Sequence, residues 1–193
     1  MAPERVLTVP NCITFGRFGL IPVFVLFHLA QRPGWALATF VVAAASDGID
    51  GLLARLLDQR TKLGGLLDPI ADKLLVFAAL CTLVVEKRLP AWLLGLVVFR
   101  DAFMGVGALV VKWKNLEIPA APSRIGKYAT FTLTVLVALA LVDQIVGESE
   151  DLHAYTRVVG FIAALCVAIS TVQYLVRFGY LFFVPTKPEA QGR

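Results

Sequence analysis

Aspartates occur in two closely spaced pairs in the first half of the chain. Asp47 and Asp50 are three residues apart and Asp68 and Asp72 are four apart, so each pair is expected on one face of a helix. The polar stretch 58–62 that joins the two segments is short, which favours two antiparallel, neighbouring helices. The four carboxylates are therefore expected to converge near one end of a helix pair.

Carboxylates that converge in this way repel one another unless a cation lies between them. Arg55 and Lys73 are the nearest candidate counter-charges, and two bases do not neutralise four acids. A divalent metal ion is the simplest additional cation, and oxygen ligands without a nearby His or Cys favour Mg²⁺ or Mn²⁺ over zinc. The alternative is a polar helix pair whose acids lie on a solvated face. Two pairs of aspartates, each on one helix face, favour the metal site over this alternative.

Small residues lie between the acids. Gly48, Gly51 and Ala54 surround the first pair, and Gly64 and Gly65 precede the second. A glycine without a side chain lets a phosphorylated ligand approach the backbone closely. Small residues also let membrane helices pack closely, and the two interpretations are compatible.

The composition identifies the elements that must position these groups. Of the 193 residues, 58% are hydrophobic and 17% are charged, whereas a soluble domain is about half apolar and about a quarter charged. This excludes a disordered chain, a disulfide scaffold and a basic nucleic-acid-binding module, so no nucleic acid partner is expected. A membrane-spanning helix needs roughly 20 mostly apolar residues, and six segments qualify: 13–29, 35–57, 65–85, 90–111, 128–146 and 156–178. We therefore expect an all-α polytopic membrane protein, with six transmembrane helices in one bundle and a single domain over residues 1–193.

Basic residues orient this bundle in a lipid bilayer. With both termini inside, twelve Lys and Arg residues fall on the inner side and four on the outer side. The positive-inside rule then places the aspartate pairs at the cytoplasmic side. We expect a multi-pass protein of a bacterial inner membrane, with its active site facing the cytoplasm.

The aspartates and small residues together form a longer pattern. It reads D-x2-D-G-x2-A-R-x8-G-x3-D-x3-D without a departure, from Asp47 to Asp72. This pattern resembles the signature of the CDP-alcohol phosphatidyltransferase family. The resemblance implies an enzyme that transfers the phosphatidyl group of CDP-diacylglycerol to an alcohol and releases CMP.

The resemblance also implies roles for individual residues. In the family the four motif aspartates bind one or two divalent metals, Mg²⁺ or Mn²⁺, and the last one accepts the proton of the attacking hydroxyl. These roles fall on Asp47, Asp50, Asp68 and Asp72, with Asp72 as the catalytic base. The family places the CDP group against the positions of Gly51, Ala54, Arg55 and Gly64. Thr61 is added as a possible donor to a phosphate, and a homodimer is expected by analogy with the family.

The acceptor site is less clearly marked. Lys112, Arg124 and Lys127 belong to a basic cluster around a proline-containing loop, and they are candidates for an acceptor phosphate. The alternative is ordinary positive-inside topology and attraction to anionic lipid. Arg100 and Asp101 lie deep in the fourth apolar segment, either as an intramembrane pair or within reach of the site. The segment that contains Asn11, Thr14 and Arg17 resembles the start of the first helix in related synthases, and these residues are candidates for the nucleotide end.

Two acceptors remain open within this chemistry. The amino-terminal segment resembles phosphatidylglycerophosphate synthases, whose acceptor is glycerol 3-phosphate, and this is the first expectation. Residues 100–131 resemble CMP-forming cardiolipin synthases nearly as well, and their acceptor is phosphatidylglycerol. A divalent-cation or proton-coupled transporter is the alternative from another class, because intramembrane carboxylates also mark ion pathways. A catalytically inactive helical bundle is the third.

Overall fold

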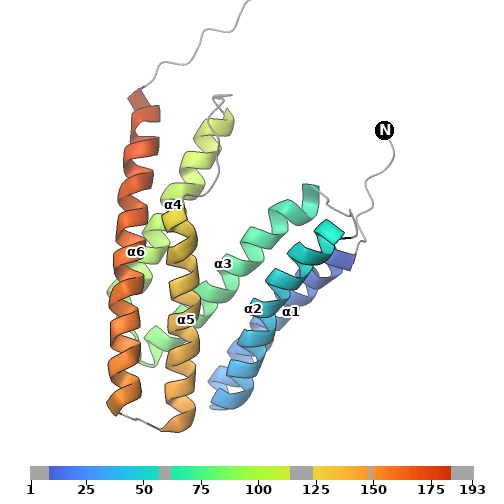
Figure 1. Cartoon of the computed structure of the whole chain (residues 1–193), viewed down its shortest axis with the longest axis vertical. Coiled ribbons are helices and arrows are strands. Elements are labelled where there is room, and N and C mark those ends of the chain that lie inside the picture. The colour runs from blue at the N-terminus through green and yellow to red at the C-terminus, as the bar shows by residue number, and fades with distance from the viewer. Residues whose placement is uncertain (1–8, 57–61, 114–123, 148–149, 184–193) are drawn as a thin grey trace, which may run out of the picture.

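The computed structural model describes residues 9–56, 62–113, 124–147 and 150–183. These residues form helices without any strand (Figure 1). In chain order the helices are α1 (Val9–Leu29), α2 (Pro33–Leu56), α3 (Lys62–Val85), α4 (Ala91–Trp113), α5 (Arg124–Val146) and α6 (Glu150–Phe183). Each of the six apolar segments expected from the sequence lies largely within one of these helices, which confirms the all-α fold class.

The apolar character of the helices identifies a membrane protein. Four helices are long and apolar enough to cross a bilayer: α1, α4, α5 and α6. The apolar part of α2 is shorter, Pro33–Ser46, because Asp47 and Asp50 follow it. Charged residues in the first half of α3 lower its hydropathy in the same way. The count of six membrane spans therefore stays a prediction.

The helices associate in two groups. Helices α1 and α2 form one antiparallel pair and α5 and α6 form another, while α3 lies against the first pair (Figure 1). Helix α3 contacts α2, as the short connection predicts, but it packs more extensively on α1. Helix α4 packs chiefly on α6. The first helix of the chain is therefore a principal neighbour of the helix that carries Asp68 and Asp72.

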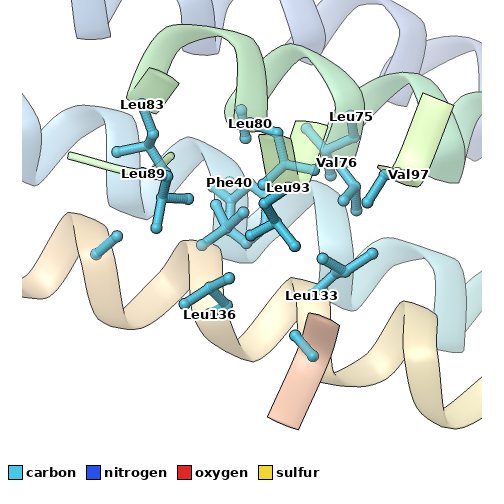
Figure 2. Packing of buried hydrophobic residues seen from close by; sticks show 14 of the residues in the cluster. Phe40, Leu75, Val76, Leu80, Leu83, Leu89, Leu93, Val97, Leu133 and Leu136 are labelled. Atoms are coloured by element: carbon cyan, nitrogen blue, oxygen red, sulfur yellow. The ribbon is translucent and has the colours of Figure 1, made fainter. Parts of the chain in front are cut away.

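Leucine is the most frequent residue in the buried core of the bundle. Leu80 and Leu83 of α3, Leu93 of α4 and Leu136 of α5 are buried together around Phe40 of α2 (Figure 2). Small buried residues on the same helices let the backbones approach one another, which is how helices pack where lipid is as apolar as the side chains. Large side chains on the outer surface, such as Phe161 and Leu165 of α6, are exposed and suit contact with lipid tails. Phe24 of α1 and Ala163 of α6 belong to the same cluster, so the core joins all six helices.

Truncation of one core leucine tests this packing. Leu136→Ala is expected to destabilise the protein by about 2–5 kcal/mol, because Leu136 is fully buried and the substitution leaves a cavity. Leu165→Ala is the matched control, since the Leu165 side chain is exposed. The measurement is unfolding of the detergent-solubilised protein by heat or denaturant. Equal effects of the two substitutions would contradict the packing described here.

Candidate active site

The second aspartate pair lies on one face of the first half of α3. Asp68 accepts a hydrogen bond from the Thr14 hydroxyl of α1, with 2.6 Å between Oγ1 and Oδ1. One helical turn later, Asp72 is half-buried and lines a cavity inside the bundle. Gly64 is buried in the first turn of the same helix. The two carboxylates thus lie as the four-residue spacing predicts, and one of them is oriented by α1.

A polar face of α1 supports this end of the bundle. Asn11, Thr14 and Arg17 are spaced by three residues and are each 1% exposed. The Nε of Arg17 donates to the Ser46 hydroxyl at 3.2 Å, and that hydroxyl donates to the Ala43 carbonyl at 2.7 Å. Ser46 directly precedes Asp47 in α2. A single helix face therefore reaches both the α3 aspartates and the segment of α2 that carries the first pair.

Several predicted site residues lie partly or wholly outside the described residues. Five predicted site residues lie in the last turns of α2, where only the backbone is described: Asp47, Asp50, Gly51, Ala54 and Arg55. The side chains of Lys112 and Arg124 are likewise not among those described. Thr61 lies outside the described residues altogether. Because α2 ends at Leu56 and α3 begins at Lys62, both aspartate pairs belong to the same end of the bundle. The convergence of all four carboxylates stays a prediction.

The described donors suit a hard metal ion but do not complete a site. Among the side chains that are described, no three His, Cys, Asp or Glu residues lie together as a metal-binding group. Asp68 and Asp72 offer carboxylate oxygens on one helix face, and the Thr14 bond engages Oδ1 of Asp68. Oxygen donors of this kind fit Mg²⁺ or Mn²⁺. The remaining ligands would have to come from Asp47 and Asp50.

A cavity of about 910 Å³, which we call the central cavity, lies among helices α2 to α6. Its polar wall includes Asp72, Lys73, Arg100 and Lys127, and most of its other lining residues are apolar. Lys127, an acceptor-site candidate from the sequence, therefore opens onto the same space as the candidate catalytic base. A charged wall opposite apolar side chains can hold a ligand with a phosphate and a lipid tail.

A network of charges crosses the wall of the central cavity. Arg100 of α4 is 4% exposed, and its Nη2 donates to the Gly126 carbonyl of α5 at 3.0 Å. Asp101 Oδ1 lies 3.6 Å from Nη1 of Arg100 and 3.4 Å from Nζ of Lys73. Arg100 and Asp101 form the pair that is one of the two alternatives left open by the sequence, and Arg100 also lines the central cavity together with Asp72. The sequence shows the buried charges but not the role of Lys73, because nothing in their spacing brings α3 to α4.

Comparison with known proteins places these observations in context. Residues 7–173 match the family model described as CDP-alcohol phosphatidyltransferase. The cardiolipin synthase (CMP-forming) of Streptomyces coelicolor is 34% identical over 157 residues, which cover 78% of this chain and 73% of the relative. The CDP-diacylglycerol–glycerol-3-phosphate 3-phosphatidyltransferase of Bacillus subtilis is 34% identical over 155 residues, which cover 72% of this chain and 79% of the relative.

Loss of the shared carboxylate tests the charge network. Asp101→Asn is expected to destabilise the protein by about 1–3 kcal/mol, because it leaves two cations without their common anion. This range lies below that for a fully buried pair, since Asp101 and Lys73 are partly exposed. Arg100→Gln and the double substitution complete a double-mutant cycle, measured by unfolding in detergent. Coupling between the two sites is expected, and strictly additive effects would show that the pair does not interact.

Proposed function

The chain belongs to the CDP-alcohol phosphatidyltransferase family, and we propose that its acceptor is phosphatidylglycerol, with CDP-diacylglycerol as the donor of the phosphatidyl group and CMP as the leaving product. The protein is a phosphatidyltransferase of phospholipid biosynthesis and a membrane protein. This function replaces the transporter and the inactive bundle considered from the sequence. The identity of the acceptor is the part that is proposed.

The charges that line the central cavity support phosphatidylglycerol as the acceptor. Three cationic side chains line the cavity among the described residues, and Asp101 is shared by two of them, Lys73 and Arg100. For Lys127, none of the carboxylates that the structure describes lies within ion-pair distance. One available cation suits the single negative charge of a phosphodiester, such as that of phosphatidylglycerol. The relative from Streptomyces coelicolor, which is named as a cardiolipin synthase, supports the same choice.

Glycerol 3-phosphate is the second candidate acceptor, as the sequence first suggested. Its phosphomonoester carries up to two negative charges at neutral pH, so it would need a second cation beside Lys127. Arg124 and Lys112 are the sequence candidates for that role. The relative from Bacillus subtilis, which is named for transfer to glycerol 3-phosphate, supports this alternative.

Each candidate site residue has its own role in the proposed reaction. The hydroxyl oxygen of the acceptor attacks the phosphorus that carries diacylglycerol, and Asp72 accepts the proton of that hydroxyl. The bond from that phosphorus to the CMP oxygen breaks, and CMP departs. Arg55 and Thr61 donate to the phosphates of the donor, while Gly51, Ala54 and Gly64 leave room for the CDP group. Lys127 holds the phosphate of the acceptor so that its hydroxyl faces Asp72.

Divalent metal ions form part of the same proposal. Asp47, Asp50, Asp68 and Asp72 would hold one or two Mg²⁺ or Mn²⁺ ions at the shared end of α2 and α3. A bound divalent ion supplies charge stabilisation for the pyrophosphate and for the departing CMP. The support is the donor chemistry of Asp68 and Asp72 and the hydrogen bond that orients Asp68.

The proposal also covers the orientation of the protein in the membrane and its oligomeric state. The excess of Lys and Arg at the end with the aspartates supports an active site that faces the cytoplasm of a bacterial cell, in the inner membrane. CDP-diacylglycerol and the acceptor would then reach the site from the lipid bilayer. A homodimer, which the family resemblance implies, stays a prediction.

The reaction is tested by CMP release from the purified protein with CDP-diacylglycerol and Mg²⁺ or Mn²⁺. Phosphatidylglycerol and glycerol 3-phosphate are supplied separately. CMP release is expected with phosphatidylglycerol and is expected to fall by about 10²-fold or more in Asp72→Asn, which keeps the shape but loses the base. Release with glycerol 3-phosphate alone would select the second candidate and leave the role of Asp72 intact.

The same assay tests the acceptor contact. Lys127→Gln is expected to raise the KM for phosphatidylglycerol by about tenfold, the loss that corresponds to one charge-assisted contact. The KM for CDP-diacylglycerol is expected to stay the same, because Lys127 is assigned to the acceptor. An equal rise of both values would place Lys127 outside the acceptor site.

The role of α1 is tested by metal binding. Thr14→Val removes the hydroxyl that orients Asp68 and is expected to weaken Mn²⁺ binding about 10- to 100-fold, as measured by electron paramagnetic resonance. Thr14→Ser keeps the hydroxyl and is expected to bind as the wild type does. Thr39→Val is the matched control, because that hydroxyl bonds to the Trp35 carbonyl of its own helix. Unchanged Mn²⁺ affinity in Thr14→Val would contradict the assignment.

A further inference from the structure

A second cavity, of about 920 Å³, lies at the opposite end of the bundle from the aspartate motif. It is formed where α3 ends, α5 ends and α6 begins, at the bottom of the bundle in Figure 1. We call it the far-end cavity, and it is lined by residues that include Glu86, Arg88, Asp143, His153 and Thr156. Glu86 follows Asp72 by 14 residues, or about 21 Å of helix. The far-end cavity is therefore separate from the site described above.

One carboxylate oxygen in this wall has no partner. Asp143 of α5 is 4% exposed, and its Oδ2 lies 2.9 Å from Nδ1 of His153 and 3.9 Å from Nη1 of Arg88. Its Oδ1 is buried and has no hydrogen-bond partner among the residues that the structure describes. An acceptor with no donor is unfavourable inside a protein. The cavity that Asp143 lines is the space from which a donor can reach it.

Thr156 of α6 lines the same cavity, and its hydroxyl oxygen also lacks a hydrogen-bond partner among the described residues. It is 8% exposed, and its Oγ1 has no partner in the described part of the chain. Other buried threonines in the bundle have partners: Thr14 donates to Asp68 at 2.6 Å, Thr39 to the Trp35 carbonyl at 2.8 Å and Thr171 to the Val167 carbonyl at 2.7 Å. Thr156 departs from this pattern. Two buried oxygens on different helices thus lack partners at one cavity.

The charges of the wall indicate what kind of donor fits. Glu86 and Asp143 share one guanidinium, that of Arg88, at 3.7 and 3.9 Å. Glu86 also contacts His28, with 3.1 Å to Nε2, and Gln144 donates to it at 2.9 Å. Apart from the two histidines, this wall carries two negative charges and one positive charge. A ligand group that donates hydrogen bonds and carries one positive charge would balance it.

The rim of the cavity carries charges of both signs. Lys87, Glu150, Asp151 and Arg157 also line the cavity, and all four are exposed. The two bases can hold an anionic group, while the wall below takes a cationic one. A bare metal ion fits less well, because Arg88 lies in the wall and the described residues contain no metal-binding group of three. The pattern therefore matches a zwitterion that combines an ammonium and a phosphate.

We propose that the far-end cavity binds the phosphoethanolamine group of an amine-bearing phospholipid. The ammonium donates to Oδ1 of Asp143 and Oγ1 of Thr156, and the phosphate contacts Lys87 and Arg157. A lipid is the source because apolar side chains beside the mouth, those of Val146 and Val158, are exposed where acyl chains would lie. With the orientation proposed above, the lipid belongs to the outer leaflet.

Native mass spectrometry of the full-length protein tests the proposal with two lipids of equal charge. The protein is released from nanodiscs that contain phosphatidylethanolamine and phosphatidylcholine in equal amounts. Phosphatidylethanolamine is expected to be retained about tenfold more, because the trimethylated headgroup has no N–H to donate. Equal retention of the two lipids would overturn the proposal and leave the cavity to water.

Substitutions locate the binding. Thr156→Val and Asp143→Asn are each expected to abolish the preference, and Thr156→Ser is expected to retain it. Glu150→Gln at the rim is the control and is expected to keep the preference. CMP release in Thr156→Val is expected to match the wild type, which shows that the protein is folded even if Asp143→Asn is not. A preference that persists in Thr156→Val would overturn the assignment.

Soluble phosphoethanolamine separates the two sources of the headgroup. It is added to lipid-depleted protein, and the thermal unfolding temperature is compared with that after addition of phosphatidylethanolamine. A rise with the phospholipid alone is expected. An equal rise with soluble phosphoethanolamine, lost in Thr156→Val, would keep the headgroup chemistry and overturn the lipid as its source.

Discussion

Arg100 is a buried guanidinium in the middle of an apolar helix, and the charge has to be compensated where it lies. Asp101 supplies the negative charge and the Gly126 carbonyl supplies an acceptor. Since Asp101 also pairs with Lys73, compensation of one charge connects α4 to both α3 and α5. Lys73 and Arg100, which this network joins, line the same cavity as Asp72. The compensation of a buried charge thus also shapes the wall of the candidate active site.

Buried polar and charged side chains need partners at both ends of the molecule, and different residues supply these partners at each end. Near the aspartate motif, Thr14 and Arg17 of α1 bring polar groups to Asp68 and Ser46, so the charged end is built from three helices. At the far end, the carboxylates of Glu86 and Asp143 are met by histidines and by Arg88. Between the two ends, leucines and alanines fill the core. Polar side chains are thus concentrated near the aspartate motif, around Arg100 and at the far end of a bundle whose core is otherwise mostly apolar.

Much of the fold could be predicted from the chain, because hydropathy alone distinguishes long apolar helices from short polar connections. The turn between the aspartate pairs likewise predicted the contact of α2 with α3. The close packing of α3 on α1 was not predictable in this way. A helix that is apolar on nearly every side has no periodicity that marks its buried face. The partner of each helix then depends on the shapes of the side chains that meet.

The spacing of the aspartates and small residues was by itself sufficient to indicate the family and to name candidate reacting groups, because phosphate chemistry requires particular residue types at fixed positions along two helices. The tertiary structure decided three features: the hydrogen bond from Thr14 to Asp68, the sharing of Asp101 by Arg100 and Lys73, and the place of Lys127 on the cavity that Asp72 lines. These contacts join residues that are far apart in the chain. Local sequence carries no record of such distances, since they arise only when apolar helices pack and their few charges must find partners.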